Sequence, residues 1–107
     1  MSAIDVMRRE ARLIILRSLG EQQNRRMTSS ALTLHMNEMF GFGWERAQLD
    51  QELDYLERMG AIKLMPAGSV RIATLLRHGA RHLSHDITIP EVMRSTDPIV
   101  LPEALGG

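Results

Sequence analysis

The spacing of apolar residues changes once along the chain, at Gly60, and this change restricts the possible folds. Before Gly60, apolar residues recur every three or four positions, which is the period of a helix with one buried face. After Gly60 come two short apolar runs, at residues 61–65 and 70–75, separated by a turn-forming segment that contains proline and glycine. The pattern predicts helices followed by a β-hairpin over residues 61–75, and therefore a mainly helical α+β domain.

Turn and capping residues divide the helical part into three segments. Gly20 follows the first amphipathic segment, and the hydroxyl residues at positions 28–30 are candidate N-caps for the second. After the hairpin, scattered prolines predict an extended tail. The expected order is helices over residues 5–19, 30–40 and 45–59, the hairpin, a short helix over residues 76–84, and a tail. We therefore expect a domain at residues 1–85 and an extended tail at residues 86–107.

Composition excludes several classes of protein. A chain of 107 residues has room for one compact domain, and the absence of cysteine excludes a disulfide scaffold and any cysteine-based zinc site. The longest apolar run, Leu13 to Leu16, is far shorter than the ~20 residues of a membrane-spanning helix. Charged residues also interrupt the N-terminal segment where a signal peptide needs its apolar stretch. We expect a cytoplasmic protein.

Three segments carry a resemblance to known families. Residues 50–62 resemble the third helix and first wing strand of bacterial MarR-like and ArsR-like regulators, through Leu-x-x-Leu followed by Gly-x-Ile. Residues 72–79 are similar to the second wing strand of the same families and the helix that follows it. Residues 8–17 are similar to small winged-helix proteins of Mu-like bacteriophages and prophages. The resemblance implies a winged helix-turn-helix with a three-helix core and a two-stranded wing, and a DNA-binding transcriptional regulator of phage or prophage type.

The third helix is the predicted DNA-reading element. Its face opposite the leucine stripe carries Ala47, Gln48, Gln51 and Arg58, and glutamine side chains can bond to adenine edges while arginine reaches phosphate or guanine. Hydroxyl groups and cations elsewhere are expected to complete the interface with double-stranded DNA. These further candidates are Arg25, Arg26, Thr28, Ser29, Ser30, Lys63, Ser69 and Arg71.

Acidic residues on the same helix support an alternative. Asp50, Glu52, Asp54 and Glu57 oppose a polyanion, because phosphate contacts dominate affinity for DNA. The alternative is a winged-helix protein–protein interaction module, a structural or accessory phage protein whose acidic third helix binds a protein partner. Four of the predicted interface cations distinguish the two hypotheses by their distance from the third helix: Arg25, Arg26, Lys63 and Arg71.

No motif in the sequence predicts catalysis or a cofactor. The chain lacks a nucleophile elbow, a phosphate-binding loop and an HExxH motif, so we expect no enzyme. His78, His82 and His85 share one helical face, but neighbouring arginines disfavour a further cation. We expect no metal and no cofactor.

Aliphatic residues beyond the core stripe predict a homodimer. Leu13 and Leu16 lie well away from the main stripe of the first helix, and the tail carries Ile87, Ile89 and Val92 among its prolines. We expect these five residues to form the interface between two copies. The alternative is a monomer in which the tail folds back and covers Leu13 and Leu16 of its own chain.

Overall fold

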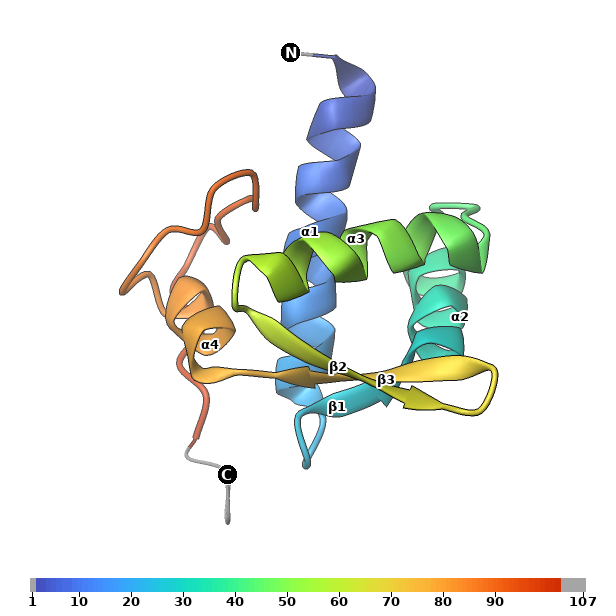
Figure 1. Cartoon of the computed structure of the whole chain (residues 1–107). Helices are drawn as coiled ribbons and strands as arrows, with labels where there is room; N and C mark the ends of the chain where they lie inside the picture. The colour runs from blue at the N-terminus through green and yellow to red at the C-terminus, as the bar shows by residue number, and fades with distance from the viewer. Residues whose placement is uncertain (1, 103–107) are drawn as a thin grey trace.

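The computed structural model describes residues 2–102, which fold into a compact α+β structure (Figure 1). Within these residues, four helices surround one side of a three-stranded antiparallel sheet. The elements are α1 (Ala3–Glu21), β1 (Arg26–Thr28), α2 (Ser29–Phe40), α3 (Arg46–Arg58), β2 (Ile62–Ala67), β3 (Val70–Leu75) and α4 (Arg77–Leu83). The predicted hairpin and the four predicted helices are confirmed.

The helix ends follow local chemistry with one exception. The Thr28 hydroxyl accepts a hydrogen bond from the Ala31 amide (3.1 Å) at the start of α2, and Gly41 ends that helix in the left-handed conformation. At the start of α3, the Glu45 amide donates to Oε1 of Gln48 (2.9 Å). The predicted end of the first helix at Gly20 is wrong. Gly20 lies inside α1 because the helix continues to Glu21.

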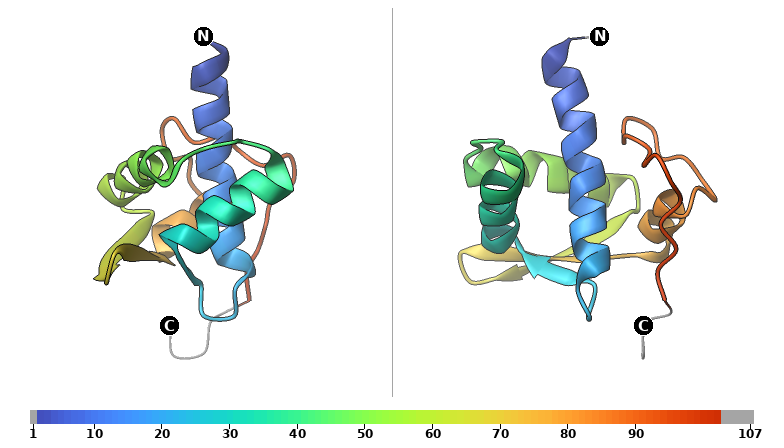
Figure 2. Two further views of the ribbon diagram at one scale, coloured as in Figure 1. Left: turned by 90° about the vertical axis from the view of Figure 1, so that its right-hand side faces the viewer. Right: turned by 180° about the vertical axis from the view of Figure 1, so that it is seen from behind.

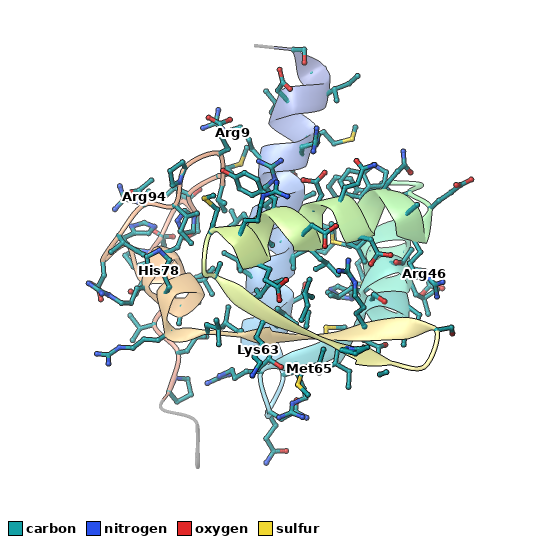
Figure 3. The ribbon with its side chains drawn as sticks, in the orientation of Figure 1. Arg9, Arg46, Lys63, Met65, His78 and Arg94 are labelled. Atoms are coloured by element: carbon teal, nitrogen blue, oxygen red, sulfur yellow. The ribbon has the colours of Figure 1, made fainter. Side chains whose placement is uncertain are left out.

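The sheet contains one strand that the sequence did not predict. β1 pairs with β3, so the order is β1-β3-β2. In this register Arg26, Thr74 and Lys63 lie in one row across the three strands. Their neighbours Ile62 and Leu75 are buried against the helices, and side chains alternate between faces of a strand. The row therefore lies on the outer face, away from α3, where Figure 3 shows Lys63 and Met65.

The tail is part of the folded core. Beyond α4 it runs alongside α1 on the rear of the molecule (Figure 2), and Ile89 and Val92 are buried there. The residues predicted for the dimer interface lie in the core of one chain instead: Leu13 is 6% exposed and Leu16 is fully buried. Ile87 is partly buried against the same core. The folded-back alternative describes residues 86–102, while residues 103–107 of the predicted tail lie outside the described part.

His82 of α4 connects this helix to the tail through two hydrogen bonds. Its fully buried ring accepts a hydrogen bond from the Ile89 amide at Nδ1 (3.0 Å), so Nε2 donates to the Met93 carbonyl (3.0 Å). His82→Ala leaves both backbone groups unpaired and opens a cavity, so we expect a loss of about 3 kcal/mol in the free energy of unfolding. Urea denaturation measures it. His78→Ala, on the exposed side of α4, is the control, and equal midpoints for the two variants contradict this role.

Candidate nucleic-acid interface

The outward face of α3 is exposed as predicted. Leu49, Leu53 and Leu56 are fully buried, which turns the opposite side of the helix to solvent. This side carries Ala47, Gln48, Gln51 and Arg58, all of them exposed. Gln48 also closes the first turn of its own helix through Glu45, which leaves Gln51 as the better placed glutamine.

Arg46 is a candidate that the sequence analysis missed. It occupies the first position of α3, is exposed, and lies at the end of the helix nearest α2 (Figure 3). The signal was present in the sequence, since Arg46 directly precedes Ala47 at the start of the predicted helix. Together with Arg58 it gives α3 one cation at each end.

Arg71 links the sheet to α3. Its guanidinium donates to Asp54 (2.7 Å) and to Asp50 (3.0 Å), and both carboxylates belong to α3. Partial burial lowers the pKa of Arg71, but the hydrogen bonds that it donates to Asp54 and Asp50 outweigh this effect and raise that pKa above its ordinary value. Arg71 therefore stays charged and neutralises part of the predicted reading helix, in place of the predicted direct contact with DNA.

The other two acids of α3 also have partners within the protein. Glu52 points inward, where it accepts hydrogen bonds from Arg8 and Arg12 (2.8 Å each). Glu57 accepts one from the Leu64 amide of β2 (2.8 Å). Three of the acids on this helix form ion pairs with arginines of other elements: Glu52 with Arg8 and Arg12, and Asp50 and Asp54 with Arg71. The tertiary structure therefore offsets part of the acidic charge of this helix.

The predicted cationic rim around α3 does not form. Arg25 has a positive φ of 61° and donates to the carbonyls of Gly20, Gln22 and Pro102, so it joins the end of α1 to the tail. Arg26 and Lys63 lie on the outer face of the sheet, because strand register directs them away from the helices. Of the four cations in question, Arg71 alone reaches α3.

The hydroxyl residues at the start of α2 are divided by burial. Ser29 is buried, and its Oγ accepts a hydrogen bond from the Arg71 amide (3.1 Å), so the predicted contact of Ser29 with phosphate is wrong. Thr28 caps the helix, and Ser30 beside it is exposed. Ser69 is exposed in the turn between β2 and β3. Thr28, Ser30 and Ser69 thus keep accessible positions.

Two of the three histidines on the predicted helical face, His82 and His85, form hydrogen bonds with the tail, and the third, His78, is exposed. His85 bonds through Nε2 to the carbonyl of Ser95 (2.9 Å), and His82 bonds as described above. Within residues 2–102, no three side chains of the metal-binding types are grouped as a metal site, and no helix is long and apolar enough to cross a membrane. Comparison of the chain with protein families, curated proteins and solved structures finds no match.

Proposed function

We propose that this chain is a winged helix-turn-helix domain. The order of α1, β1, α2 and α3 followed by the β2–β3 hairpin supports this assignment, since it places a hairpin wing directly after a pair of helices joined by a short glycine-containing segment. The sheet order β1-β3-β2 also fits, because it holds the hairpin beside the start of α2.

We propose further that the domain binds double-stranded DNA through the outward face of α3, as a transcriptional regulator of phage or prophage type. The observation that carries the proposal is the pairing of Asp50, Glu52 and Asp54 with arginines, which reduces the main electrostatic obstacle to DNA. In this role Gln51 contacts base edges, Arg46 and Arg58 contact phosphates, and the exposed start of α2 at Ser30 contacts a further phosphate.

A second candidate is a winged-helix protein–protein interaction module without DNA binding. The position of Arg26 and Lys63 on the outer face of the sheet favours it, because these cations cannot support a duplex lying on α3. The two candidates predict different results with DNA, because the first requires binding in low salt and the second requires none.

The test is a salt titration of binding to a fluorescent random duplex, followed by anisotropy. We expect measurable binding in low salt, with the logarithm of affinity falling by about 0.9 per contacted phosphate for each unit of log salt. Arg46→Ala removes one phosphate contact and is expected to reduce this slope by about 0.9 per protomer.

Lys63→Ala is the matched control, since it removes the same charge from the opposite face of the sheet. We expect its affinity and slope to equal those of the unmodified protein. A reduced slope for Lys63→Ala with none for Arg46→Ala contradicts the use of α3. Absence of binding in low salt contradicts the DNA proposal and favours the interaction module.

A further inference from the structure

The outer face of the sheet is left uncovered by residues 2–102, because the helices pack against the opposite side (Figure 1). Strand register forms two adjacent rows of three residues on this face. They are Arg26, Thr74 and Lys63 in the first row, and Thr28, Ile72 and Met65 in the second. We propose that this face binds an acidic protein segment that also carries apolar side chains. The proposal goes beyond the proposed function, because this face points away from α3 (Figure 3).

The first row carries positive charge that the protein does not use. Arg26 and Lys63 are exposed, and among the described residues neither side chain forms an ion pair or a hydrogen bond. The three strands contain no aspartate or glutamate, so no carboxylate of the sheet balances these two cations. The remaining strand cation, Arg71, is paired with Asp50 and Asp54 on the inner face. The unused charge of the outer face favours a negatively charged partner.

The second row begins an apolar patch that is separate from the core. Met65 is 51% exposed and lies opposite Ile72, and Ala67 lies opposite Val70 farther along the same two strands. None of these four side chains belongs to the hydrophobic core or packs against it. A phosphate backbone offers nothing apolar to cover them, whereas a protein segment does. Because the other three are only half exposed, the patch is too shallow to insert into a lipid surface.

The partner is expected to lie on the face of the sheet rather than to extend it by a further strand. β2 is an edge strand, but its Leu64 amide already donates to Glu57 (2.8 Å), and Pro66 has no amide to donate. Side chains on one face of a strand recur every two residues, about 7 Å apart. An extended segment along the strands therefore meets the cation row with one residue and the apolar row with the residue two positions away. The expected pattern in the partner is an acid, any residue and then an apolar residue.

Titration of the isotope-labelled protein with a short peptide, followed by NMR, tests the proposal. The peptide repeats Asp-Ser-Leu-Ser, which puts aspartate and leucine on one face of an extended chain. We expect it to shift the amide signals of Lys63, Met65 and Thr74. Lys63→Glu is expected to weaken the affinity at least about fivefold, because it replaces attraction by repulsion. Met65→Ser is expected to weaken it about threefold, because it removes apolar contact area.

Arg17→Glu, an exposed charge reversal on α1, is the matched control and is expected to leave peptide binding unchanged. Circular dichroism establishes that every variant is folded. Absence of shifts on the three strands overturns the proposal, and so does equal affinity for a peptide with lysine in place of aspartate. Larger shifts of the same amides with a random duplex or with anionic vesicles also overturn it, since the face then binds phosphate groups. Loss of DNA binding with peptide binding intact contradicts only the proposed function.

Discussion

Replacement of Glu52 by alanine is expected to lower the free energy of unfolding by about 4 kcal/mol. Glu52 is 2% exposed and accepts hydrogen bonds from Arg8 and Arg12 (2.8 Å each). Arg12 is itself 7% exposed, so the variant leaves a guanidinium largely buried without its carboxylate. Breaking a buried pair from one side is far more costly than losing a surface pair. Urea denaturation followed by circular dichroism measures the loss.

The effect extends to the tail, because Arg12 also donates to the Glu91 carbonyl (2.9 Å) and stacks 3.9 Å from the centre of the Tyr55 ring. Glu38→Ala, an exposed carboxylate on α2, is the control and is expected to change stability by less than about 0.5 kcal/mol. Glu52→Leu combined with Arg12→Met removes both charges and is expected to cost less than Glu52→Ala alone. Equal stability of Glu52→Ala and Glu38→Ala contradicts the role of the cluster.

Gly79→Ala is expected to destabilise the protein by about 3 kcal/mol and to lower its melting temperature by about 12 °C. An added Cβ lies 2.5 Å from the carbonyl oxygen of Ala61 and 2.8 Å from Cδ1 of Leu75. The first of these is a backbone atom of the residue directly before β2, so the clash separates α4 from the sheet. Alanine in a helix is otherwise favoured over glycine by up to about 1 kcal/mol, so the sign of the change is diagnostic. Thermal unfolding measures it.

Gly20→Ala is the matched control inside α1. There an added Cβ lies 3.1 Å from a methyl group of Leu101, a side chain that can move, so the helix-propensity gain offsets most of the cost. We expect a change within about 1 kcal/mol. A Gly79→Ala variant as stable as Gly20→Ala contradicts the close contact of α4 with the sheet.

The local elements of this protein follow from its sequence. The leucine stripe of α3, the hydroxyl cap of α2 and the turn before Val70 each depend on residues that are neighbours along the chain. Their signals are amphipathic period, capping chemistry and turn propensity, which act within a few positions. The helices, the hairpin and the exposed face of α3 were therefore predictable from the sequence, and so were Gln51 and Arg58 as exposed candidates.

Side-chain partners and strand direction were decided by the tertiary structure. β1 has three residues and acquires its role only by pairing with β3, more than forty positions away. Glu52 meets Arg8 and Arg12 across similar separations, and this pairing offsets part of the acidic charge of α3. Arg26 and Lys63 leave the predicted interface because register, rather than residue type, sets the face to which a strand residue points. Hydrophobic period specifies which side of an element is buried, but contacts between distant elements determine which charges meet.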